Sequence, residues 1–149
     1  MNRILTLGVA LAALAVLPWA VAAPGPKDAK EDAKKKFEGD WKVESWEQSG
    51  QVLEVAPDWS FKGDKYTLNL GAVPEEGGIK VDAAKNPSTI DLEITGGNCA
   101  GNTQLGIYKF DGEKLVLCLA WPGDKDRPTE FKSTAEPRTI LITLKREKK

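Results

Sequence analysis

Hydrophobic and polar residues alternate with a period of two along most of the chain after Gly39. The alternation is clearest where Ile90, Leu92 and Ile94 are separated by acidic residues. This period is typical of half-buried β-strands, and no stretch beyond residue 39 has the 3.6-residue period of a long amphipathic helix. Glycine, proline and acidic residues mark turns between the segments. The pattern predicts strands at residues 40–48, 57–62, 65–70, 77–81, 88–95, 104–110, 114–120 and 138–145.

Each of these eight strands has one apolar face, and most connections are short. Such a chain suits an all-β fold, an eight-stranded antiparallel up-and-down barrel, because closure leaves no unpaired strand edge. A two-sheet sandwich is the alternative. Trp46 and Trp121 do not follow the inner-face pattern, so we expect them to pack on the outer surface. The residues predicted to face inward are Trp41, Val43, Trp59, Phe61, Tyr66, Leu68, Leu70, Ile79, Val81, Ile90, Leu92, Ile94, Tyr108, Phe110, Leu115, Leu117, Leu119, Ile140, Ile142 and Leu144.

Several short motifs resemble known barrel families. Gly39-Asp40-Trp41 resembles the G-x-W signature of lipocalins and other calycin-type barrels. In those barrels the tryptophan closes the bottom under a basic residue of the last strand, which implies Lys145 or Arg146 here. Further phrases, among them 61–66 and 127–131, resemble a lipocalin-like uncharacterised domain family that is abundant in planctomycete bacteria. That family has no established activity, so the resemblance implies a lipocalin-like fold without naming a function.

The first 22 residues are typical of a secretory signal peptide. Arg3 precedes an apolar run, and the small residues Ala20 and Ala22 form a cleavage signal. We therefore expect cleavage after Ala22 and export to the periplasm or the extracellular space. An uncleaved membrane anchor is the alternative, but the run is shorter than a spanning helix requires, so we expect no stable membrane insertion after cleavage.

The rest of the chain is predicted to consist of a linker and one barrel domain. Residues 23–38 are rich in lysine, aspartate and glutamate, with Phe37 as the only large apolar side chain. A segment with so little to bury is predicted to be a charged, solvated linker. Residues 39–149 form the predicted barrel domain.

Composition excludes several classes of function. The chain has 21 basic and 22 acidic residues, which argues against a nucleic-acid-binding protein that works through a basic face. It has no histidine, which excludes a Ser-His-Asp triad and any histidine-bearing zinc site. Glu75-Glu76 and 124–126 lack the spacing of a calcium loop, and the glycine-rich stretch 96–102 lacks the ending of a phosphate loop. We expect no metal, no cofactor and no enzymatic activity.

Two hypotheses for function remain, and both treat the protein as a monomer. In the first, the barrel binds a small apolar molecule. In the second, the core is closed and the domain is a structural or protein-interaction module of the cell envelope, because side chains alone can nearly fill an eight-stranded barrel. The interior residues predicted to bind a ligand under the first hypothesis are Trp41, Trp59, Phe61, Tyr66, Leu68, Tyr108, Phe110 and Leu117.

Two further features bear on the site. Arg127, Glu130 and Phe131 are predicted to lie in a loop over the barrel mouth, with Arg127 able to pair with Glu130; a plug that closes one barrel end is the alternative. Cys99 and Cys118 are the only cysteines. Export favours their oxidation to a disulfide, while the alternative is a partly buried Cys118 and a free thiol in the loop.

Overall fold

In the computed structural model, the described residues 26–147 contain one α-helix and nine β-strands. The predicted signal peptide and the start of the predicted linker lie outside these residues. The helix of the described part is too short and too polar to span a bilayer. The elements are α1 (Pro26–Phe37), β1 (Gly39–Gln48), β2 (Gln51–Leu53), β3 (Asp58–Lys62), β4 (Lys65–Asn69), β5 (Glu75–Asp82), β6 (Ser88–Gly96), β7 (Thr103–Asp111), β8 (Lys114–Ala120) and β9 (Thr139–Arg146).

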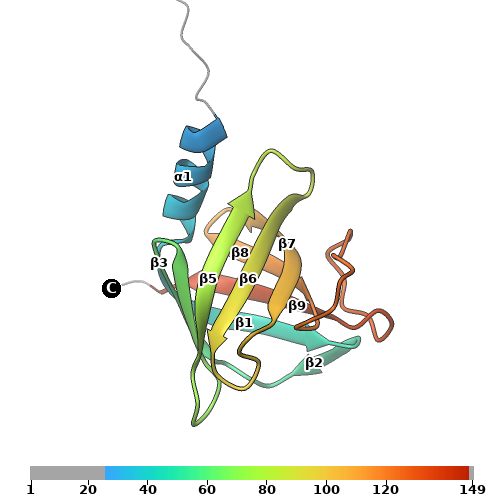
Figure 1. Cartoon of the computed structure of the whole chain (residues 1–149). Helices are drawn as coiled ribbons and strands as arrows, with labels where there is room; N and C mark the ends of the chain where they lie inside the picture. Colours follow the sequence, from blue (N-terminus) through green and yellow to red (C-terminus); the bar gives the residue numbers. More distant parts are fainter. Residues whose placement is uncertain (1–25, 148–149) are drawn as a thin grey trace, which may run out of the picture.

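The strands form a closed antiparallel barrel, which confirms the predicted fold class. From β3 to β9 each strand pairs with the next one in sequence, and β1 pairs with both β3 and β9 (Figure 1). The pairing of β1 with β9 closes the eight-stranded wall, so the sandwich alternative is wrong. The additional strand β2 pairs only with the last residues of β1 and extends one end of the wall.

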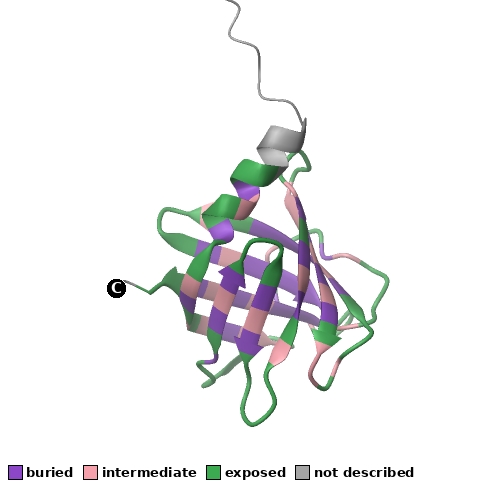
Figure 2. Ribbon diagram, turned by 60° about the vertical axis from the view of Figure 1, so that its left-hand side comes forward, coloured by how far each residue is buried: buried purple, intermediate pink, exposed green. Residues whose placement is uncertain are grey.

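The alternation of inward and outward residues is the one that the sequence predicts. In β6, Ile90, Leu92 and Ile94 are buried and the residues between them are partly exposed (Figure 2). Nearly all of the predicted inner set is buried; Val43 and Phe110 are partly buried and pack against the core. Leu70 is the exception, because it follows the end of β4 and is 44% exposed. Each fully buried large side chain contributes roughly 1.5–3 kcal/mol to folding.

A β-bulge in β1 corrects the prediction for Trp46. The register with β9 shifts between Val43 and Ser45, so Glu44 has no directly opposite partner. One extra residue reverses the facing of everything after it. Trp41 and Trp46 therefore both point inward although they are five positions apart, and Trp46 is only 7% exposed. The placement of Trp46 on the outer surface was wrong because strict alternation cannot anticipate a bulge.

Helix α1 corrects the prediction of a solvated linker. Ala33 and Phe37 are four residues apart, so they share one face of the helix, and both are buried against the end of the barrel. The Phe37 ring packs edge-on against three aromatic rings of the barrel at centroid distances of 4.9–5.3 Å. These rings belong to Phe61, Tyr108 and Phe110. The helix thus closes this end of the barrel, hereafter the closed end.

Trp41 and Arg146 fasten the helix to the barrel. The Trp41 indole N–H donates to the carbonyl of Phe37 at 2.7 Å. The Arg146 guanidinium lies 4.3 Å from the centroid of the Trp41 ring and donates from Nη2 to the Lys36 carbonyl at 2.7 Å. Carbonyls in the last turn of a helix lack intrahelical partners, and Arg146 supplies a donor to one of them. Of the two basic residues that the resemblance implied, Arg146 covers the tryptophan.

We predict that Phe37→Ala destabilises the protein by about 3–5 kcal/mol, the usual cost of deleting a large buried aromatic side chain. Urea denaturation measures this loss, and hydrogen exchange should show that the amides of α1 lose protection at the same time. Lys35→Ala is the control, since Lys35 is exposed on the same helix turn. Equal effects of the two substitutions would mean that the helix does not depend on the contact of Phe37 with the barrel.

We predict a similar loss, about 3–5 kcal/mol, for Trp46→Ala, because the side chain is buried in the core. Chemical denaturation followed by far-UV circular dichroism measures it. A loss below about 1 kcal/mol is typical of a surface position and would show that the bulge in β1 is absent in solution.

Candidate functional site

The end of the barrel opposite α1 contains an apolar pocket of about 270 Å³, hereafter the open-end pocket. It lies where β1 ends, β5 begins and the loops after β4, β6 and β8 meet. Most of its lining is apolar, as is usual for sites that bind small organic molecules. The lining residues are Trp46, Gln48, Leu53, Val55, Leu68, Leu70, Glu75, Cys99, Gln104, Leu119, Trp121, Pro122 and Ile140.

The apolar lining has a buried floor and an exposed rim. Leu68 and Leu119 belong to the barrel core and are nearly inaccessible. At the rim, Leu53, Val55 and Leu70 are 37%, 39% and 44% exposed. An exposed apolar cluster that continues into a buried floor is a common feature of binding sites in soluble proteins. The rim is therefore the natural entrance to the pocket.

The Glu75 carboxylate lies on one wall of the pocket and is hydrogen-bonded to the phenol of Tyr66. The Tyr66 hydroxyl donates a hydrogen bond to Glu75 Oε1 at 2.9 Å. Burial raises the pKa of the Glu75 carboxyl, and the Tyr66 bond opposes part of that rise. Burial, followed by the neighbouring Glu75 charge, also raises the pKa of Tyr66. The phenol therefore remains a neutral donor and holds the orientation of the carboxylate.

Trp46 presents an unused donor at the same pocket. Its indole Nε1 is buried, and no group of the described residues accepts a hydrogen bond from it. An unsatisfied buried donor costs roughly 1–3 kcal/mol. By contrast, the nearby Gln104 side-chain amide donates to the Ala120 carbonyl at 2.8 Å.

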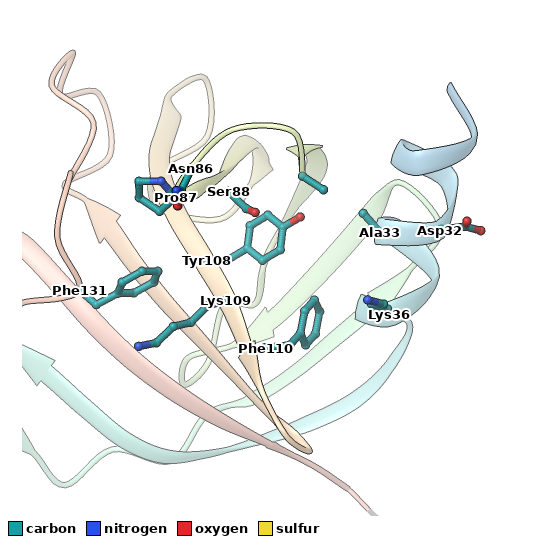
Figure 3. A pocket seen from close by; sticks show the side chains of 11 residues that line it. Asp32, Ala33, Lys36, Asn86, Pro87, Ser88, Tyr108, Lys109, Phe110 and Phe131 are labelled. Carbon is teal, nitrogen blue, oxygen red and sulfur yellow. The ribbon is translucent and has the colours of Figure 1, made fainter. Parts of the chain in front are cut away.

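A second depression, of about 450 Å³, lies at the closed end between α1, the β5–β6 loop and β7. Figure 3 shows Tyr108 and Phe110 on the side of β7 toward α1, and Lys109 and Phe131 on the other side. The Tyr108 and Phe110 rings already pack against Phe37. This depression therefore surrounds the docked helix, and its apolar groups are less available than those of the open-end pocket.

The residues predicted to bind a ligand in the barrel interior are spread over both ends and the centre. Leu68 lines the open-end pocket, and Tyr66 reaches it through Glu75. Trp59 and Leu117 belong to the packed core. The remaining four are at the closed end: Trp41, Phe61, Tyr108 and Phe110. A ligand role for these eight residues stays a prediction.

The segment between β8 and β9 does not lie over the barrel mouth as predicted. Arg127 pairs with Asp91 at 2.7 Å and donates to the carbonyls of Ile90 and Gly106 at 3.2 and 2.8 Å. Asp91 lies between inward-facing neighbours, so it points outward, and Arg127 is bound to the outer wall. Glu130 is exposed.

The segment does not lie over the barrel mouth because it packs against apolar residues on the outer wall. Phe131 packs with outward-facing Lys109, whose Nζ is 4.6 Å from the ring centroid. Under the same segment lie Ile107 and Cys118, which are almost completely buried although they face away from the core. Only the first residues of the segment, Trp121 and Pro122, reach the open-end pocket.

Both cysteines are free, so the disulfide prediction is corrected. Cys99 lines the open-end pocket, whereas Cys118 is buried beneath the segment after β8 and its thiol donates to the Lys132 carbonyl at 3.4 Å. Burial raises the pKa of Cys118. The alternative considered from the sequence, a buried Cys118 and a loop thiol, matches this arrangement. No group of three potential metal-ligating side chains occurs in the described part of the chain.

We predict that iodoacetamide modifies Cys99 and not Cys118 in the folded protein. The thiolate is the reactive form, and burial both shields Cys118 and disfavours its ionisation. Intact mass should show one adduct in buffer and two in urea, with peptide mapping to identify the site. Two unmodified cysteines in urea, with a mass two units lower than the reduced chain, would instead reveal a disulfide.

Comparisons with known proteins supply no relative for this chain. No protein-family model, no curated protein and no solved structure matches it. The likeness to the lipocalin-like family stays a resemblance between motifs, and arguments about function rest on the geometry of the pocket.

Proposed function

We propose that this protein binds a small, mainly apolar molecule in the open-end pocket, without a chemical step. The observation that carries the proposal is an apolar pocket whose floor is the barrel core and whose rim is exposed. Transfer of apolar surface from water to such a pocket contributes roughly 25 cal/mol per Å². The volume of about 270 Å³ is just below the usual range of ligand pockets, so it suits a small ligand.

The barrel serves this pocket as a rigid support. Large side chains fill its centre, and α1 closes its other end, so binding at the open end does not require the core to rearrange. Glu75 supplies a polar group at the wall of the pocket, which would orient a ligand in the apolar surroundings. A carrier outside the cytoplasm, as the predicted signal peptide and the lipocalin resemblance imply, is the setting that we propose.

An interaction module without a ligand is the second candidate. The observation that favours it is the apolar surface beyond the pocket: Val52 on β2 and Val73 after β4 are 67% and 51% exposed. Neither residue lines the open-end pocket. Exposed apolar patches mark protein contacts as well as ligand-binding grooves, so a direct binding measurement separates the two candidates.

We predict that the neutral dye N-phenyl-1-naphthylamine binds the protein at micromolar concentration and that Leu70→Asn weakens binding about tenfold. The substitution replaces an apolar rim contact by a polar group, a loss of about 1.4 kcal/mol. Dye fluorescence measures the affinity, and quenching of tryptophan fluorescence reports proximity to Trp46 and Trp121, the two tryptophans of the pocket lining.

Val73→Asn is the matched control for this prediction. It makes the same kind of change on the same loop, at an exposed residue outside the pocket lining, and should leave dye affinity unchanged. Absence of dye binding to the folded wild type would favour the interaction module. Equal weakening by both substitutions would place the dye on the outer apolar surface.

A further inference from the structure

We propose that the ligand of the open-end pocket carries a protonated amine, which pairs with the carboxylate of Glu75. This inference rests on the proposed function, since it assigns the chemical class of the molecule bound at that site. Three observations support it: Glu75 occupies an inner-face position at the pocket, Tyr66 holds its carboxylate, and no cationic side chain of the described residues pairs with it.

The position of Glu75 is an inner-face position. Along β5, Gly77, Ile79 and Val81 are buried and alternate with more exposed residues, and Glu75 continues the inward series at the open end. Its Cα partner on β4 is Leu68, which belongs to the core and lines the pocket. Period-two alternation would place an apolar residue here. The chain instead carries a carboxylate at the wall of an apolar pocket.

The neighbourhood holds this carboxylate in place. Tyr66 lies opposite Gly77, and a side chain at Gly77 would meet the Glu93 carbonyl oxygen at 2.1 Å and the Tyr66 ring at 3.0 Å. The absence of a side chain there lets the Tyr66 ring lie across β5, so its hydroxyl reaches Glu75. A fixed carboxylate is a better binding group than a mobile one, because less conformational entropy is lost on binding.

The carboxylate has no cationic partner among the described residues. The ion pairs of this part of the chain use other acids, and no lysine or arginine lies within 4 Å of Glu75. A partly buried negative charge without a counter-charge is unfavourable, which agrees with the rise in the pKa of its carboxyl. A ligand ammonium group would supply the missing charge, and charge-assisted hydrogen bonds are the strongest that it could form.

The cation near the pocket is less suited to bind an anionic ligand. Arg138 lies 4.5 Å from the ring centroid of Trp121, which lines the pocket, but Arg138 is exposed and does not line it. Solvent screens an exposed charge more than a half-buried one.

The test compares octylamine, 1-octanol and octanoate as competitors of N-phenyl-1-naphthylamine at pH 8 and low salt. The three share an eight-carbon chain, and their head groups at pH 8 are cationic, neutral and anionic, respectively. We expect octylamine to displace the dye at about tenfold lower concentration than octanol, and octanoate to be the weakest, because only the amine satisfies the Glu75 charge. Glu75→Gln should abolish the advantage of octylamine and retain dye binding.

Glu76→Gln is the matched control, since it removes the same charge from the adjacent, exposed residue and should keep the wild-type order. Equal displacement by octylamine and octanol, or an octylamine advantage that Glu76→Gln also abolishes, would overturn the amine assignment while dye binding still supports the pocket. If octanoate displaced the dye most strongly, the amine assignment would be overturned, and an anionic head group paired with Arg138 would take its place. If neither dye nor competitor binds, the proposed function fails as well. If Glu75→Gln does not fold, the order in which the three competitors displace the dye from the wild-type protein decides whether the amine assignment holds.

Discussion

The pairing of β1 with β9 is the constraint on which the rest of the molecule depends. It joins residues about a hundred positions apart and converts an open meander into a barrel. To do this, β1 pairs with β3 at its start, β2 at its end and β9 along nearly its whole length. The bulge at Glu44 is what lets one strand serve all three, because it bends β1 and returns a second tryptophan to the interior.

Closure also makes the two ends of the barrel different. At one end Trp41 and Arg146, which are opposite each other on β1 and β9, hold the last turn of α1 in place. At the other end the same two strands supply Trp46 and Ile140 to the wall of the open-end pocket. A single strand pair thus holds α1 at the closed end and borders the pocket at the open end. At the closed end the apolar groups pack against α1, whereas those of the open-end pocket do not.

The inner faces of the strands could be predicted from the sequence because each depends on local alternation and on turn residues. The features that were missed depend on surfaces that form only after the barrel closes. Phe37 has little to bury along its own helix and becomes a core residue because three aromatic rings form a recess for it. Arg127 pairs with Asp91 and two strand carbonyls on the outer wall instead of with Glu130, its predicted partner nearby in sequence. Alternation does not show where a strand ends, so it places Leu70 in the core although this residue follows the end of β4 and is exposed.

The candidate site was hardest to predict, for a related physical reason. In the sequence, Glu75 belongs to a pair of glutamates at the end of a loop, and such pairs are usually solvated. Parity gives the two residues opposite directions: Glu76 faces out and is exposed, while Glu75 faces in beside Tyr66. The alternation of inward and outward residues that predicts the apolar core therefore also locates Glu75, the one acidic residue on the inner face of β5. A partly buried carboxylate without a cationic partner costs folding free energy, so its place at the pocket wall is the exception to the strand pattern on which the proposed amine binding rests.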